Sequence, residues 1–189
     1  MVLLAFVASS SQATIILELD LPQLVGRSDV IFVGKAIKTY SHWSEDKRHI
    51  VTDTTFQVST AVSGVSQGKS VVIRRLGGAV GGIGMRVSGA PSFNKGDEVL
   101  LFTEKRGNGK RYVVGMKQGA FRITRDRTAR QVVQTRLDGL ALARRSPQGR
   151  LQMIERREAG PELLGHFVNR IRQTIALCAR EKTRCRSRE

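Results

Sequence analysis

Aromatic residues are scarce in this chain of 189 residues, where one Trp, two Tyr and seven Phe make up 5% of the sequence. A surface that stacks nucleic-acid bases needs several exposed rings, so this scarcity weighs against one. Acidic residues are also few, at 16 against 32 Lys and Arg. Residues 1–100 carry 10 basic and 8 acidic residues, whereas residues 101–189 carry 22 and 8. The net charge of +16 indicates either a polyanionic partner or a dispersed, solvated basic surface.

Long hydrophobic runs are missing, because no segment approaches the roughly 20 apolar residues of a membrane-spanning helix. We therefore predict no integral membrane segment in the mature chain. Residues 1–13, MVLLAFVASSSQA, combine a short apolar core with a small-x-small end, as in a secretory signal without its basic start. A buried first strand is the alternative. We expect an exported protein, periplasmic or extracellular.

Cysteine is nearly absent, with Cys178 and Cys185 as the only two. Two cysteines cannot supply a four-ligand zinc site. A spacing of seven within one continuous helix separates the residues by about 10 Å, which is beyond disulfide reach. The cysteines pair only if the helix ends between them; otherwise Cys178 is a small core residue and Cys185 a free thiol.

Catalytic and cofactor motifs are not found either. The three histidines, His42, His49 and His166, lack H-E-x-x-H spacing, and no G-x-S-x-G elbow is present. The carboxylate pairs at 45–46 and 97–98 fall in predicted turns. We therefore predict a non-catalytic protein with no metal and no cofactor.

Short runs rich in β-branched residues, separated by glycine turns, predict a mainly β protein. Asp20 before Leu21-Pro22 predicts a short helix that ends near Gly26. A kink is expected at Gly34 within the first long strand. The pattern predicts a five- to six-stranded antiparallel OB-like barrel over residues 18–137. Its expected strands are 29–40, 49–63, 70–76, 98–104, 111–116 and 119–124, with a further one at 129–135.

The C-terminal part differs in composition and in the spacing of its apolar residues. Residues 138–160 are basic and broken by Pro147 and Gly149, so we interpret them as a linker. Residues 161–182 carry apolar positions at helical spacing and predict an amphipathic helix, followed by a basic tail at 183–189. The helix either packs on the barrel, mediates association with itself or a partner, or lies on an anionic membrane.

The least ordinary stretch is 71–93, VVIRRLGGAVGGIGMRVSGAPSF, which contains six glycines. It lacks the third glycine of a dinucleotide fingerprint and the Lys of a P-loop. We predict either a binding surface there or merely the corner of the barrel. The nearby loop 41–49 holds the only Trp, which is either a binding anchor or folded over the barrel end. The candidate binding residues are Trp43, Arg74, Arg75, Gly77, Gly78, Gly81, Gly82, Gly84 and Arg86.

Several strand segments together resemble exported bacterial domains of the netrin-like or tissue-inhibitor-of-metalloproteinases type: SDVIFVGKAI at 28–37, TFQV at 55–58, AVSG at 61–64, SVVI at 70–73 and KGDEVLLF at 95–102. The resemblance covers about residues 20–124 and implies an OB-like barrel that is secreted and acts by protein contact. Inhibitors of that family chelate zinc through an N-terminal cysteine, and this chain has none before Cys178. Their inhibitory site therefore does not transfer.

The sequence thus predicts an exported interaction module that binds an unknown protein partner through residues 77–89 and the adjacent loop. The alternative is a barrel that binds a polyanion, either single-stranded nucleic acid or acidic polysaccharide.

Overall fold

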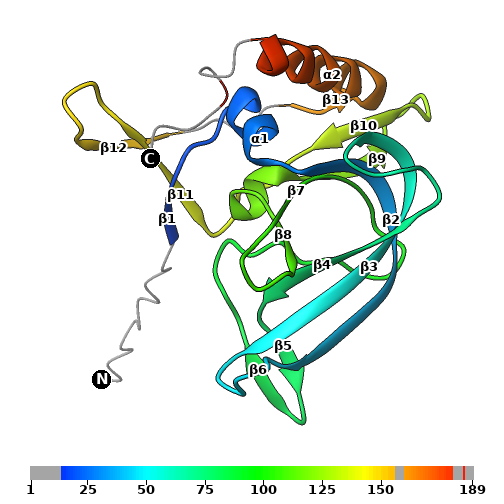
Figure 1. Ribbon diagram of the computed structural model, residues 1–189, viewed down its shortest axis with the longest axis vertical. Coiled ribbons are helices and arrows are strands. Elements are labelled where there is room, and N and C mark those ends of the chain that lie inside the picture. Colours follow the sequence, from blue (N-terminus) through cyan, green and yellow to red (C-terminus); the bar gives the residue numbers. More distant parts are fainter. Residues whose placement is uncertain (1–13, 156–159, 181–184, 186–189) are drawn as a thin grey trace, which may run out of the picture.

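The computed structural model of the chain describes residues 14–155, 160–180 and 185. These residues form a mainly β protein with two α-helices and one 3-10 helix, Met116–Gly119 (Figure 1). The main sheet is hydrogen-bonded in the order β13-β10-β9-β7-β2-β3-β4, and β8 also pairs with β7. Its strands are β2 (Val30–Trp43), β3 (Ile50–Ser63), β4 (Ser70–Leu76), β7 (Glu98–Lys105), β8 (Arg111–Val113), β9 (Ala120–Arg125), β10 (Gln131–Gln134) and β13 (Glu162–Leu163).

The main sheet is strongly curled, because β2 and β3 pair over 14 residues each with three register shifts. Such irregularities bend strands and increase their twist. One shift lies between Val33 and Gly34, where the sequence predicted a kink. The curl brings β8 beside β4, but the described strand pairings do not join the ends of the sheet into a closed barrel.

The first part of β2, residues 30–34, and most of β7 are buried on both faces, which explains the continuous apolar sequence of each. Phe32 and Leu101 point into a core enclosed by the curled sheet, where Phe32 meets Phe56 at a ring distance of 5.9 Å. Their neighbours Ile31 and Phe102 point to the opposite face and into a second core beneath the helices. The alternation of side chains along a strand therefore gives the protein two cores.

The two helices cover one face of the sheet. Helix α1 (Leu21–Arg27) begins with a capping box in which Asp20 accepts a hydrogen bond from the Gln23 amide and the Gln23 side chain accepts one from the Asp20 amide. Helix α2 (Leu164–Arg180) buries Phe167 and Ile171 in the core. Of the three interpretations of this helix, packing on the sheet is confirmed. It begins later than predicted because β13 precedes it.

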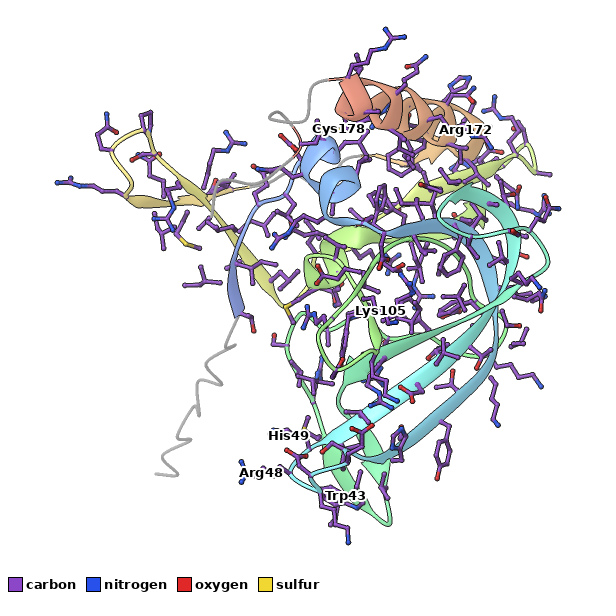
Figure 2. The ribbon with its side chains drawn as sticks, viewed as in Figure 1. Trp43, Arg48, His49, Lys105, Arg172 and Cys178 are labelled. Carbon is purple, nitrogen blue, oxygen red and sulfur yellow. A yellow bond between two sulfur atoms is a disulfide. The ribbon has the colours of Figure 1, made fainter. Side chains whose placement is uncertain are left out.

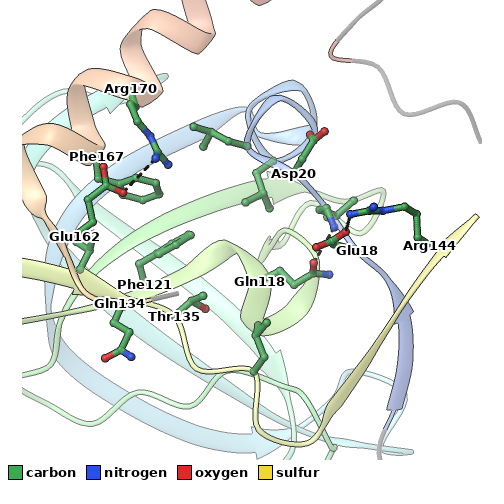
Figure 3. Close-up of a pocket in the computed structure, with 16 residues that line it drawn as sticks. Glu18, Asp20, Gln118, Phe121, Gln134, Thr135, Arg144, Glu162, Phe167 and Arg170 are labelled. Atoms are coloured by element: carbon green, nitrogen blue, oxygen red, sulfur yellow. Dashed lines mark hydrogen bonds and ion pairs between the residues drawn. The ribbon is translucent and has the colours of Figure 1, made fainter. Parts of the chain in front are cut away.

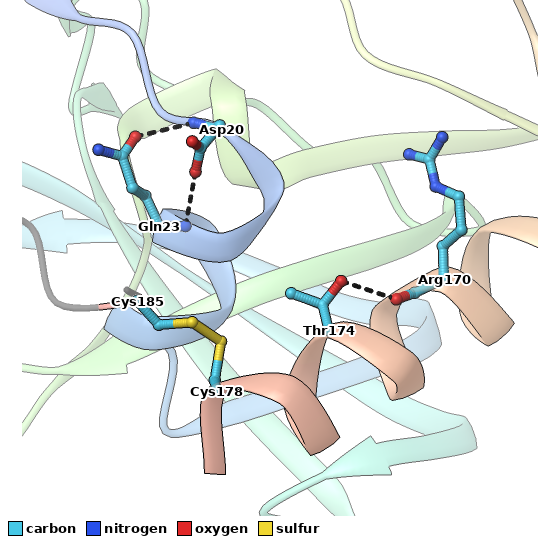
Figure 4. The surroundings of a disulfide bond; sticks show 6 residues. All are labelled: Asp20, Gln23, Arg170, Thr174, Cys178 and Cys185. Atoms are coloured by element: carbon cyan, nitrogen blue, oxygen red, sulfur yellow. Dashed lines mark hydrogen bonds between the residues drawn. A yellow bond between two sulfur atoms is a disulfide. The ribbon is translucent and has the colours of Figure 1, made fainter. Parts of the chain in front are cut away.

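A disulfide holds the end of α2 near α1 (Figure 4). Helix α2 ends at Arg180, so Cys178 and Cys185 are not on one helix, and their Cα atoms lie 5.6 Å apart. The alternative of a free thiol at Cys185 is therefore wrong. Gly26 does not end α1 but lies within it, where an added Cβ would overlap the backbone carbonyl of Cys185.

Residues 140–154 form a β-hairpin, where the sequence predicted a linker. Strand β11 (Leu140–Arg145) pairs antiparallel with β12 (Leu151–Ile154) and parallel with β1 (Thr14–Leu17). The turn is closed by the Ser146 amide, which donates to the Arg150 carbonyl over 2.8 Å. Pro147 and Gly149 therefore form the turn of a hairpin instead of interrupting its structure.

Candidate binding surface around the glycine hairpin

The glycine-rich stretch forms a small hairpin at one end of the molecule (Figure 1). Strand β5 (Gly78–Val80) pairs with β6 (Ile83–Met85) across a turn at Gly81 and Gly82. Both turn residues have positive φ, at 55° and 81°, as a tight two-residue hairpin turn requires. No atom lies within 4 Å of the Cβ positions of Gly81, Gly82 or Gly84, so this tip projects into open space.

The two glycines at the base of the hairpin have a packing role. A Cβ on Gly78 would lie 2.5 Å from the hydroxyls of Ser41 and Thr52, and one on Gly77 would lie 2.7 Å from the Met85 carbonyl. These glycines let the hairpin lie directly on the ends of β2 and β3. The predicted set therefore divides into base glycines that the packing requires and tip glycines that it does not.

Exposed apolar side chains lie on this hairpin and at the end of β2 beside it. Strand β2 extends through most of the predicted loop, so Trp43 lies at the strand end and on the same face as Ser41, beside the hairpin (Figure 2). Trp43 is 40% exposed and Ile83, on β6, is 56% exposed. Tyr40, 62% exposed, stacks on His42 on the opposite face of β2. Trp43 is therefore partly accessible at the end of β2, on the face where the hairpin packs.

Arg74 is part of an internal ion pair. Its guanidinium donates to both carboxylate oxygens of Asp53, over 2.8 and 2.7 Å, and His42 lies 3.1 Å from the same carboxylate. Burial alone raises the pKa of Asp53, but the hydrogen bonds from Arg74 and His42 outweigh it and leave the pKa below its usual value. Only 8% of Arg74 is exposed. Arg74 thus holds β3 and β4 together and is not a free binding residue.

Arg75 has the opposite environment. No described carboxylate lies within ion-pair distance of it, its buried Nε has no hydrogen-bond partner among the described residues, and burial lowers its pKa. Its side chain lines a cleft of about 720 Å³ between the base of the hairpin and the turns near Lys117 and Asp138. Arg86 lines the same cleft, is exposed, and makes no hydrogen bond or ion pair with any described residue.

Sequence reasoning did not identify the far wall of this cleft. Lys117 extends from the 3-10 helix and lies 2.5 Å from an Asp138 oxygen. This hydrogen bond has the largest effect on the pKa of Asp138, which it lowers, and it keeps the carboxylate ionised. Ser88 donates to the Gly139 carbonyl over 2.8 Å, which joins the glycine stretch to the same turn. Lys117 and Asp138 lie in ordinary turn sequences, and only the tertiary structure brings them to Arg75.

A second cavity, of about 330 Å³, lies between the helices, β10 and β11 (Figure 3). Its apolar lining includes Phe121 and Phe167, whose rings are 4.7 Å apart. Ion pairs stand at its rim, one of them between Arg170 and Glu162 at 3.5 Å. Gln118 is almost fully buried and accepts a hydrogen bond from the Leu19 amide, so the cavity's buried amide already has its partners within the fold.

Comparison with protein-family models and with curated proteins finds no match to this chain. Within residues 14–155, 160–180 and 185, no group of three or more His, Cys, Asp and Glu side chains is placed to hold a metal ion. No helix in this described part is long and apolar enough to cross a membrane.

Proposed function

We propose that this chain is an exported, non-catalytic interaction module that recognises a protein partner through the glycine hairpin and Trp43. The observation that carries the proposal is the exposure of Trp43 and Ile83 beside a hairpin tip with no packing neighbours. Exposed aromatic residues next to accessible backbone are typical anchors of protein interfaces. The disulfide supports export, because such bonds persist in oxidising compartments.

The test compares retention of proteins from the exported fraction by three forms of the chain. A double variant, Trp43→Ala with Ile83→Ser, should lose a partner that the wild type retains. The control is Leu177→Ser, which changes a side chain as exposed as Ile83, at 56%, but on helix α2. A partner retained by the double variant, or lost equally in the control, contradicts the proposal. Uncleaved protein in the cytoplasm contradicts export.

We also propose an OB-like arrangement of the main sheet, in keeping with the netrin-like resemblance. The support is the pairing of β2 with both β3 and β7, together with the position of β8 on β7 and beside β4. A seam between β4 and β8 would complete a five-stranded ring. Nuclear Overhauser contacts between Leu76 and Val113 across this seam are expected, and their absence contradicts the arrangement.

A further inference from the structure

We propose that the cleft lined by Arg75, Arg86 and Lys117 binds a phosphate or sulfate group. The sequence raised a polyanion as an alternative partner, and the present proposal specifies the chemical group that is bound and the cleft that binds it. It goes beyond the protein-binding function proposed above and does not depend on it. Three cationic side chains from three segments line the cleft, and its single carboxylate, Asp138, pairs with Lys117. Arg75 and Arg86 therefore carry the charge that has no described counterion there.

Arg75 has no ionic partner among the described residues. A charged side chain that is half withdrawn from water is normally paired, and leaving it unpaired is unfavourable. The adjacent Arg74 obeys this rule through Asp53, whereas Arg75 bonds only to the Leu76 carbonyl, at 3.3 Å. A guanidinium presents a planar fork that matches the oxygens of phosphate or sulfate. The missing partner of Arg75 is therefore best supplied by such an anion.

The walls of the cleft are held in place by hydrogen bonds within the fold. The Lys117 amide donates to the Gly89 carbonyl over 3.2 Å, and Ser88 is bonded to Gly139. Gly89 is buried, and a Cβ there would overlap the Leu140 side chain. The segment carrying Arg86 is thus anchored at its base to the wall that carries Lys117. A preformed cleft binds without a large ordering cost.

Cationic side chains continue beyond this cleft. An adjoining cavity of about 410 Å³ shares Ser92, Lys117 and Asp138 with it and is also lined by Arg122 and Arg136. Arg122 is paired with Asp97 at 3.2 Å, so it contributes less free charge than Arg136. The positive potential therefore extends along a groove and would draw an anion towards Arg75.

The experiment titrates the full chain with inorganic phosphate and, separately, with sulfate, while chloride keeps the ionic strength constant. Thermal unfolding and calorimetry report binding, because an anion bound only to the folded state raises the melting temperature. We expect a saturable rise with phosphate or sulfate. Arg75→Gln should weaken the affinity about tenfold or more, since a hydrogen bond to a charged group is lost. The matched control, Arg74→Gln, should unfold at lower temperature but keep the response.

The stability of the Arg75 variant and the behaviour of a second variant complete the test of anion binding. Without added anion, Arg75→Gln should be no less stable than the wild type, because Arg75 has no ionic partner among the described residues and loses only a long hydrogen bond to the Leu76 carbonyl. Should Arg75→Gln fail to fold, the exposed Arg86→Ser provides the second variant and should also weaken binding. A wild type that shows no saturable response overturns the proposal. So does an Arg75→Gln protein, or failing that an Arg86→Ser protein, that binds as the wild type does. Neither result bears on the protein partner.

Discussion

Replacing Ile171 with Ala tests directly whether helix α2 is part of the folded core. Ile171 is 0% exposed and belongs to the core between the helices and the sheet. The change removes about three methylene equivalents, each contributing about 0.8 kcal/mol, and leaves a cavity. We expect the free energy of unfolding to fall by about 3 to 4 kcal/mol.

The control for this prediction is on the same helix. Leu177 is 56% exposed, so Leu177→Ala should change stability by less than about 0.5 kcal/mol. Urea unfolding followed by circular dichroism, with the disulfide intact, measures both variants. A loss below about 1 kcal/mol for Ile171→Ala, or equal losses for the two variants, refutes the packing of α2 that we describe.

Four other substitutions test the disulfide, the ion pair and the hairpin. Cys178→Ser should lower stability by about 2 kcal/mol, and mild reduction of the wild type should do the same in a thermal melt. The pKa of Asp53 is lower in the folded protein than its unfolded-state value of 3.8. Its pairing with Arg74 therefore stabilises the protein at pH values above 3.8. This contribution is lost as the pH falls through the folded-state pKa. A stability titration of Asp53→Asn should therefore lack that part of the acid dependence. Gly78→Ala should cost about 2 kcal/mol or more by overpacking, whereas Gly84→Ala should be nearly neutral in the same melt.

The strands and helices were largely predictable because their signals are local. The apolar runs of β2 and β7 and the glycine turns between strands specify a mainly β protein whatever the remainder of the chain does. Asp20, as a helix-capping residue, and the apolar stripe around Phe167 and Ile171 likewise predict the two helices. The hairpin at 140–154 was missed because β12 is short and exposed, and β11 pairs with β1, which lies more than 120 residues away in the sequence.

The candidate site shows the same division between local and tertiary information. The sequence by itself determined that glycines and arginines gather at 71–93 and that one Trp lies nearby. It could not distinguish Arg74 from Arg75, two identical neighbours. Adjacent residues of a strand point to opposite faces, and the register of β3 against β4 decides that Asp53 faces Arg74 and Thr52 faces Arg75. Only tertiary packing then brings Lys117 to the cleft of Arg75, because that contact depends on chain segments with no signal of their own.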